Sequence, residues 1–196
     1  MSKYTVALDF GHGGADPGAM WMGVRESWLV REIGRHLVHH LTIISQGEIS
    51  VVCVAPLDNE FAGKDSLSHR AMLVNSSKAD IVVSVHINAA TNPRASGFEV
   101  IYCPGSRKGL ILADQIHEAL DTGDNGNILP RRPGPITDIQ CGRGFGFTML
   151  RKTRPPAAIV EAGFITNDRD QVEIVENCSN ISTCIAVGIW NYFTGD

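Results

Sequence analysis

The sequence lacks three features: a long apolar run, an excess of basic residues and a pair of closely spaced cysteines. No segment approaches the roughly 18 consecutive apolar residues that a membrane-spanning helix needs, so we expect no stable membrane association. The 17 Lys+Arg are outnumbered by 21 Asp+Glu, and the formal net charge is -4. This balance offers no basic surface for a phosphate backbone and excludes nucleic acid as a partner.

The five cysteines are scattered and form no Cys-x-x-Cys motif, which argues against a zinc knuckle or a redox pair. Cys53 lies in Val51-Val52-Cys53-Val54 and is predicted to be a small core residue, whereas Cys141 lies in a glycine-rich stretch where we expect exposure. Neither cysteine has an activating neighbour in the sequence, so we assign neither a catalytic role.

The first residues also lack the pattern of a secretory signal, because Met1-Ser2-Lys3-Tyr4 leads directly into a strand-like stretch. We therefore expect synthesis in the cytoplasm without a signal peptide. The 196 residues, 43% of them hydrophobic, contain neither an internal repeat nor a linker. This length and composition predict a single domain over residues 1–196. The oligomeric state is left open.

The chain alternates short apolar runs with segments of helical periodicity, which is typical of a layered α/β domain. Strands are predicted at Tyr4–Phe10, Ser50–Ala55, Asp80–His86, Phe98–Tyr102 and Ala157–Glu161. Helices are predicted from about Glu26 to Gly47 and at Leu67–Ser77, Lys108–Leu120, Arg169–Glu176 and Ile181–Tyr192. The stretch Asp121–Gly146 is rich in glycine and proline and is predicted to be one long surface loop.

Two histidines follow directly on predicted strands. His12 comes among glycines after the first strand, and His86 ends the run Ile81-Val82-Val83-Ser84-Val85. In open α/β sheets, ligands bind at the carboxyl edge of the strands. A single histidine at a strand end is more often hydrogen-bonded structure than a metal ligand, so neither residue is decisive alone.

Two glutamates complete the set of candidate residues. Glu26 opens the first helix, where the helix dipole alone can explain a glutamate. Glu161 follows four apolar residues, and burying a carboxylate there is costly, which favours a functional explanation. Two imidazoles and a carboxylate form a common catalytic zinc shell, and a further carboxylate can act as the base.

An alternative metal site is Glu32-His36-His40, whose spacing aligns the three side chains on one face of the first helix. These positions lie away from the apolar stripe of that helix, so we interpret them as solvated. His69 and His117 have no matching partners and are expected on helix surfaces.

Four motifs occur in order along almost the whole chain, and their combination is highly specific. They are Leu8-Asp9-Phe10-Gly11-His12-Gly13-Gly14-x-Asp16-Pro17-Gly18-Ala19, then Arg70-Ala71-x-x-x-Asn75, then Ser84-Val85-His86-x-Asn88-Ala89, and last Val160-Glu161-x-Gly163-Phe164-Ile165-Thr166-Asn167. With these motifs the chain resembles the zinc-dependent N-acetylmuramoyl-L-alanine amidases of bacterial cell-wall hydrolases and phage endolysins.

The resemblance implies an α/β fold with a mixed, mostly parallel sheet of about six strands sandwiched by helices. It further implies that His12, Glu26 and His86 bind Zn²⁺ and that Glu161 is the catalytic acid/base, with Glu32 as the alternative to Glu26. Asn88 and Arg143 are the candidates for stabilising the oxyanion.

The implied reaction is hydrolysis of the amide bond between N-acetylmuramic acid and L-alanine in bacterial peptidoglycan. The expected setting is a phage or prophage endolysin that acts on the cell wall after release. The alternatives are a zinc peptidase that cleaves within the stem peptide, a peptidoglycan-binding module without activity, and a structural domain whose histidines are incidental.

Overall fold

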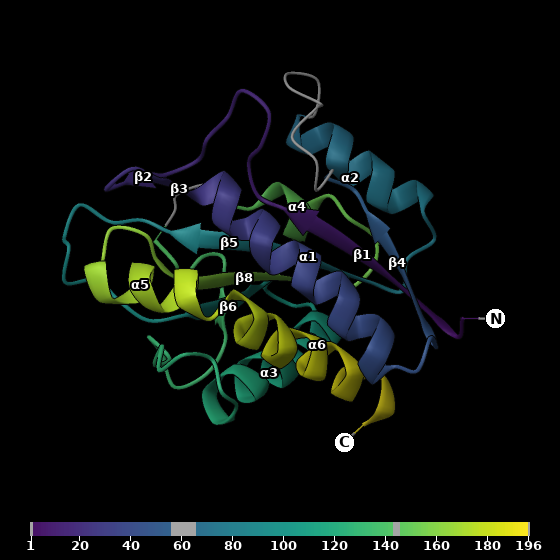
Figure 1. The fold of residues 1–196 in the computed structure, drawn as a ribbon. Helices are drawn as coiled ribbons and strands as arrows, with labels where there is room; N and C mark the ends of the chain where they lie inside the picture. Colours follow the sequence, from purple (N-terminus) through teal and green to yellow (C-terminus); the bar gives the residue numbers. More distant parts are fainter. Residues whose placement is uncertain (1, 56–65, 143–145, 196) are drawn as a thin grey trace.

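The centre of the molecule is a six-stranded β-sheet in the order β4-β1-β5-β8-β6-β7 (Figure 1). The computed structural model describes residues 2–55, 66–142 and 146–195. Four strands run parallel, namely β4 (Ile49–Cys53), β1 (Tyr4–Phe10), β5 (Ile81–Asn88) and β8 (Ala157–Phe164). The strands β6 (Glu99–Tyr102) and β7 (Ile136–Thr137) run the opposite way. The predicted mixed, mostly parallel sheet is confirmed.

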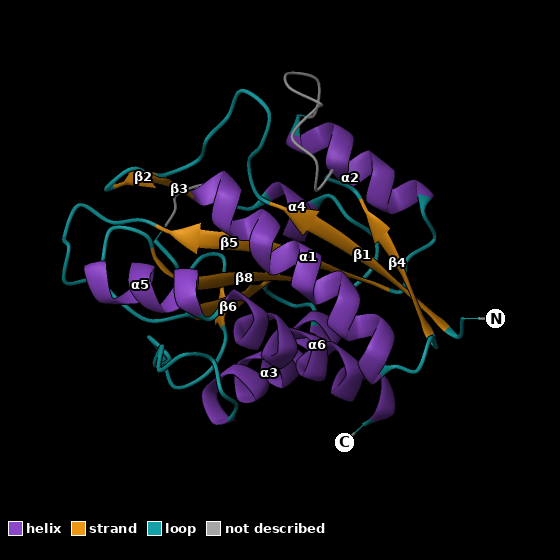
Figure 2. Ribbon diagram, in the orientation of Figure 1, coloured by secondary structure: helices purple, strands orange, loops and turns teal. Residues whose placement is uncertain are grey.

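Helices cover both faces of this sheet (Figure 2). One face carries α1 (Glu26–Ile44), α3 (Arg107–Thr122) and α6 (Cys178–Thr194), with α5 (Asp168–Glu176) following β8. Among the described residues, the other face carries α2 (Leu67–Ser76) and the single turn α4 (Thr148–Arg151) as its only helices. A small hairpin of β2 (Met20–Trp21) and β3 (Val24–Arg25) precedes α1.

The alternation of side chains along the strands decides what each face carries. Val85 and Val160 point into the larger core beneath α1, α3 and α6. Their neighbours His86 and Glu161 therefore point to the opposite face, where Ile159 joins the smaller core beneath α2 and α4. Since these two helices are short, the carboxyl edge of the sheet is less covered on this face. The polar side chains His86 and Glu161, near the carboxyl ends of β5 and β8, thus point to the less covered face of the sheet.

The structure differs from the expected elements in the stretch Asp121–Gly146. This stretch is not wholly irregular, because β7 lies within it and pairs with β6. A strand of two residues leaves no detectable run in the sequence, and neither does the short hairpin of β2 and β3. The single turn α4 was not predicted either. The remaining strands and helices lie where the apolar pattern predicts them, with shifts of their ends.

Two single-residue expectations were wrong. Cys53 is exposed rather than in the core, because it ends β4, a strand at the edge of the sheet. His117 is buried rather than on a helix surface. Its Nε2 lies 3.1 Å from the carbonyl oxygen of Arg132, and its ring lies beside Phe98. The carbonyl group of Arg132 thus contacts a side chain of α3, and nothing in the sequence indicates this contact.

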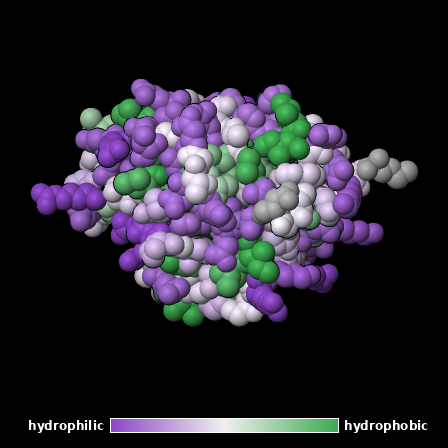
Figure 3. Space-filling view, turned by 90° about the horizontal axis from the view of Figure 1, so that it is seen from below, coloured by the Kyte–Doolittle hydropathy of each residue, from purple (hydrophilic) through white to green (hydrophobic). Residues whose placement is uncertain are grey.

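The start of β1 lies beside the end of α6. The ring of Tyr4, at the start of β1, stacks on that of Phe193, near the end of α6, with centroids 4.2 Å apart. The face of the molecule seen from below is mostly hydrophilic, with apolar side chains in small separate groups (Figure 3). Among the described helices, none combines the length and apolarity required to cross a membrane.

Candidate active site

The loop that follows β1 presents His12 in a strained conformation. Its φ of 62° lies in the left-handed region, which is costly for a residue with a side chain. Arg31 and Arg70 both donate to the His12 carbonyl oxygen, at 2.8 Å and 2.9 Å. Arg70 is in turn held by Asp9 at 3.0 Å, and Asp9 also accepts a hydrogen bond from Ser84. The buried network supports a backbone geometry that the loop would not adopt by itself.

The ring of His12 is oriented by a second carboxylate. Its Nδ1 lies 2.8 Å from Asp16 Oδ2, on the solvent side of the loop. The opposite ring nitrogen, Nε2, then faces Glu26 Oε2 at 3.1 Å. Since Asp16 occupies Nδ1, the tautomer with a proton on Nδ1 leaves the Nε2 lone pair available to a metal ion.

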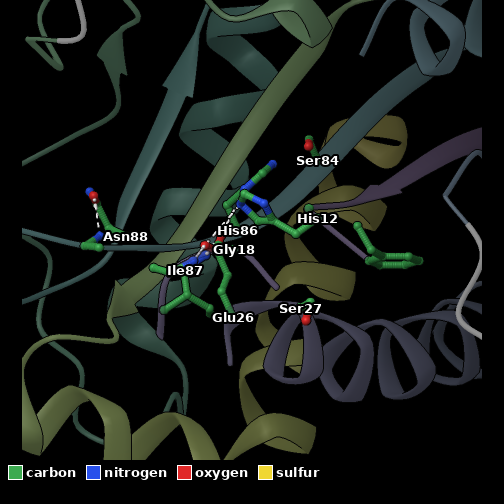
Figure 4. A network of polar contacts seen from close by, with 12 residues as sticks. His12, Gly18, Glu26, Ser27, Ser84, His86, Ile87 and Asn88 are labelled. Carbon is green, nitrogen blue, oxygen red and sulfur yellow. Dashed lines mark hydrogen bonds and ion pairs between the residues drawn. The ribbon is translucent and has the colours of Figure 1, made fainter. Parts of the chain in front are cut away.

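Glu26 is the first residue of α1 and is buried, with 4% of its surface exposed. Backbone N–H groups hold both of its oxygens: Ile87 donates to Oε1 and Ala19 donates to Oε2, each at 3.0 Å. The same two oxygens face His86 and His12, so the carboxylate lies between the two rings. Figure 4 shows the Glu26 side chain reaching from the start of α1 to His86.

His86 lies on β5 and directs its Nδ1 to Glu26 Oε1 at a distance of 3.1 Å. Its ring occupies the space that a side chain at Gly11, in the loop after β1, would fill. A Cβ atom at Gly11 would lie only 2.3 Å from His86 Cε1 and 2.4 Å from Nδ1. The glycine in the first motif therefore leaves room for the second histidine, which explains why a side chain is absent there.

His12, Glu26 and His86 together form a group able to hold a metal ion. One possible ligand atom from each residue lies within 4.8 Å of those of the other two. The two rings meet edge to face, with centroids 5.3 Å apart (Figure 4). The structure thus brings together three residues that lie far apart in the sequence, on the loop after β1, the start of α1 and the end of β5.

The electrostatics of this group favour positive charge at both rings. The hydrogen bond to Glu26 raises the pKa of His12 to about 9. Burial has the largest effect on the pKa of His86 and lowers it, but the hydrogen bond to Glu26 and the negative charges of Glu161, Glu26 and Asp9 together outweigh burial, and the pKa is raised. Burial similarly opposes ionisation of Glu26, whereas the hydrogen bonds from the two histidines lower its pKa below the ordinary value. A divalent cation can supply the same positive charge in place of these protons.

Glu161 lies beside this group on β8, with 1% of its surface exposed. It is in register with His86 on β5 and with Glu99 on β6, and register partners point to the same face of a sheet. All three side chains border the same open side of the sheet. A cleft of about 430 Å³ contains His12, Glu26, His86 and Glu161, with apolar walls that include Leu67, Phe147 and Met149. A carboxylate thus faces a possible metal site across a space that can admit a substrate.

The alternative metal residues do not join this group. Glu32 is ion-paired with Arg35 on the surface of α1. His40 Nε2 lies 3.1 Å from Ser179 Oγ on α6. The Asn88 amide donates to Glu99 at 3.1 Å, which ties it to the acid that neighbours Glu161. Arg143, the other candidate for the oxyanion, lies outside the described residues.

Sequence reasoning gave no role to several residues that support the site. Asp9, Asp16 and Arg70 fall within the motifs, which indicates that they matter. The motifs do not show which groups these residues contact, because the contacts depend on the fold. Arg31 lies outside every motif. Its place on the apolar side of α1 is the signal that could have identified it, because a buried guanidinium group requires hydrogen-bond partners.

Comparisons with known proteins agree with this architecture. A family model described as N-acetylmuramoyl-L-alanine amidase matches residues 6–191. The germination-specific N-acetylmuramoyl-L-alanine amidase of Bacillus subtilis is 25% identical over 206 residues, which cover 99% of this chain and 81% of that protein. The endolysin of Bacillus phage SPP1 is 32% identical over 182 residues, which cover 91% of this chain and 60% of that protein.

A solved structure of an amidase has the same fold as this chain. The crystal structure of an N-acetylmuramoyl-L-alanine amidase from Clostridium difficile 630 matches with a TM-score of 0.84 at 28% identity, and the match covers 100% of both chains. The family model spans the strands and loops that carry His12, Glu26, His86 and Glu161. The chain therefore belongs to the N-acetylmuramoyl-L-alanine amidase family.

Proposed function

We propose that this amidase is zinc-dependent and hydrolyses the amide bond between the lactyl group of N-acetylmuramic acid and L-alanine in peptidoglycan. In this proposal His12, Glu26 and His86 hold the zinc, and Glu161 is the acid/base. One observation carries the assignment: one possible ligand atom from each of three residues lies within 4.8 Å of the other two, and the buried carboxylate of Glu161 lines the same cleft.

The donor set and its spacing suit zinc. Zinc commonly takes nitrogen and carboxylate ligands at about 2.0–2.2 Å in a tetrahedron, which places neighbouring donor atoms about 3.3–3.6 Å apart. The two nitrogen–oxygen distances from Glu26 to the rings of His12 and His86 are both 3.1 Å. Catalytic zinc sites use three protein ligands and keep one position for water or substrate. Three residues that border an open cleft match this arrangement.

The protein's own groups fix the geometry of the reaction. Asp16 holds the His12 ring, Arg31 and Arg70 hold the His12 backbone, and Gly11 leaves the room that the His86 ring occupies. These contacts exist before substrate binds, so little reorganisation is needed during the reaction. When bound, zinc would act as a Lewis acid toward the lactyl carbonyl and would lower the pKa of water at the site.

Glu161 moves the protons of the reaction. It accepts a proton from the water whose oxygen bonds to the lactyl carbonyl carbon. As the carbon–nitrogen bond breaks, the same carboxyl group returns a proton to the nitrogen of the departing L-alanine. The products are a lactyl carboxylate on the sugar and a free amino group on the stem peptide. One buried carboxylate next to the metal ligands is sufficient for both transfers, and no acyl-enzyme is required.

The test is product identification on purified peptidoglycan. We expect mass spectrometry and amine labelling to find free L-alanine amino groups and intact N-acetylmuramic acid. Activity should be lost with a chelator and restored by zinc, and His12→Ala should remain inactive at the zinc concentration that restores the wild type. New amino groups within the stem peptide would instead identify a zinc peptidase. Full activity after complete metal removal would refute the zinc assignment.

We further propose that the biological setting is that of a phage or prophage endolysin. In this setting the enzyme is made in the cytoplasm and reaches the wall after a separate protein permeabilises the membrane. The support is the 32% identity to the endolysin of Bacillus phage SPP1, of which this chain spans 60%. Expression inside a bacterial host tests the proposal. Turbidity should remain stable until a membrane-permeabilising agent is added and should then fall rapidly, whereas lysis without the agent would argue against it.

A further inference from the structure

A second cleft, lined by arginines, lies between the segment that precedes β6, the segment 127–131 and the start of α5. Its volume is about 450 Å³, and Arg94, Arg131 and Arg169 all line it. The segment that carries Arg131 pairs with Phe98, immediately before β6, through hydrogen bonds in both directions. The cleft therefore borders the same edge of the sheet as the catalytic groups.

A row of charged side chains connects the two clefts. His86, Glu161 and Glu99 occupy register positions on the adjacent strands β5, β8 and β6, and they point to one face. Arg131 continues the row, because its Nε lies 3.4 Å from Glu99 Oε1. Its guanidinium also lies over the Phe164 ring, 4.9 Å from the ring centroid. The metal-binding group, the acid/base and the first arginine thus follow one another across the sheet.

The polar groups of this cleft leave positive charge available. Asp170 is its acidic residue, but Asp170 Oδ2 accepts hydrogen bonds from the backbone of Gly97 and Phe164, at 2.7 Å and 2.9 Å. Arg94 and Arg169 are exposed. The positive charge of Arg169 acts on Asp170, but among the described residues neither Arg94 nor Arg169 forms an ion pair. Two guanidinium groups can therefore accept an anionic ligand without first breaking an ion pair. In a chain with a formal net charge of -4, this is a local concentration of positive charge.

The roles proposed for the catalytic groups set the direction of the substrate. The lactyl carbonyl must lie toward the metal ligands, and the departing nitrogen must lie toward Glu161. The bond thus points from His86 toward Glu161, and the peptide that follows the nitrogen continues toward Glu99 and Arg131. Neighbouring strands are about 4.8 Å apart, so the arginine segment lies roughly 10 Å beyond Glu161. An extended peptide covers that distance with about three residues.

We propose that the arginine cleft binds the free carboxylates of the stem peptide, two to three residues beyond the scissile bond. This inference rests on the proposed function, which fixes the direction of the substrate. Peptidoglycan stems carry carboxylates at these positions when their acidic residues are not amidated. The planar guanidinium fork of arginine matches a carboxylate with two parallel hydrogen bonds. The cleft thus makes this amidase selective for the charge state of the stem peptide.

The experiment compares two soluble substrates, N-acetylmuramyl tripeptides that differ only in a free or an amidated carboxylate on the second residue. The double variant Arg94→Ala, Arg169→Ala avoids Arg131, which contacts an acid next to Glu161. We expect the wild type to prefer the free carboxylate and the double variant to raise KM for that substrate about tenfold, with kcat nearly unchanged. The amidated substrate should be cleaved equally by both proteins. The wild-type preference should also weaken as salt is raised.

The matched control is Arg107→Ala. Arg107 is an exposed arginine that opens α3, at the end of β6 away from the catalytic edge. This variant should retain the wild-type preference. Calorimetric binding of the free acidic tripeptide should weaken in the double variant and stay unchanged in Arg107→Ala.

The possible results separate the two proposals. A double variant that retains the preference, or that loses activity equally on both substrates, overturns the inference while the proposed function stands. Weaker binding to walls that carry anionic polymers, with unchanged tripeptide kinetics, assigns the cleft to those polymers and also overturns it. A wild type that cleaves neither tripeptide at the lactyl amide refutes the proposed function and the inference with it.

Discussion

Gly11→Ala tests whether the supporting loop positions the second histidine. The added Cβ would lie 2.3 Å from His86 Cε1, whereas an ordinary contact is 3.4–4 Å, so the ring must retreat by about 1 Å. Binding sites typically tolerate displacements of about 0.5 Å. Gly11 does not have a left-handed φ, so the substitution introduces no backbone strain. We expect zinc affinity to fall about 10–100-fold, the usual effect of losing support for a ligand.

The assay is a competition titration with a chromogenic chelator, performed together with rate measurements at saturating zinc. The thermal midpoint of the metal-free protein should change little, because the His86 ring borders the cleft and can move into it. Gly134→Ala is the control, since a Cβ at Gly134 meets no atom within 4 Å. If Gly11→Ala binds zinc as tightly as the wild type and hydrolyses peptidoglycan at the same rate, the packing of His86 on Gly11 does not position the ligand.

Three other perturbations separate the roles of the site residues. Glu161→Gln should keep zinc bound but lower kcat by about 10²–10⁴-fold, because an amide cannot accept the proton; loss of zinc would make Glu161 a ligand. Glu26→Gln should weaken zinc binding, whereas Glu32→Gln should not, because Glu32 pairs with Arg35 on the helix surface; the reverse result would move the ligand to Glu32. Zinc at a hundredfold excess over its Kd should raise the free energy of unfolding by about 2.7 kcal/mol, which denaturant titration measures; an unchanged midpoint would contradict a bound metal.

Much of the fold was predictable because the sheet is largely buried on both faces. Its four parallel strands therefore appear in the sequence as short apolar runs, such as Ala157-Ala158-Ile159-Val160. The strand β7, with two residues, has no such pattern. Cys53 carried the apolar signature of a core strand, but burial also depends on position in the sheet, and the edge position of β4 is set by strand order.

The candidate site was predictable where residues follow strands. His12 and His86 end neighbouring parallel strands, so their proximity follows from topology. Glu26 was harder to assign, because Glu32 is also on α1 and only the packing of the helix end decides which one faces the histidines. The supporting contacts of Arg31 could not be predicted, since they join a helix side chain to the carbonyl of a strained loop residue.

The stacking of Tyr4 on Phe193 joins the start of the first strand to the end of the last helix. The parallel strands that lead to the cleft begin at this end of the molecule, so the catalytic edge lies at their opposite ends. A wall-binding module fused before β1 or after α6 would thus lie at the end of the molecule opposite the cleft and would leave the cleft accessible. The proximity of Tyr4 and Phe193 also makes this domain suited to circular permutation, in which a short linker joins the start of β1 to the end of α6 and the chain is opened in a surface loop.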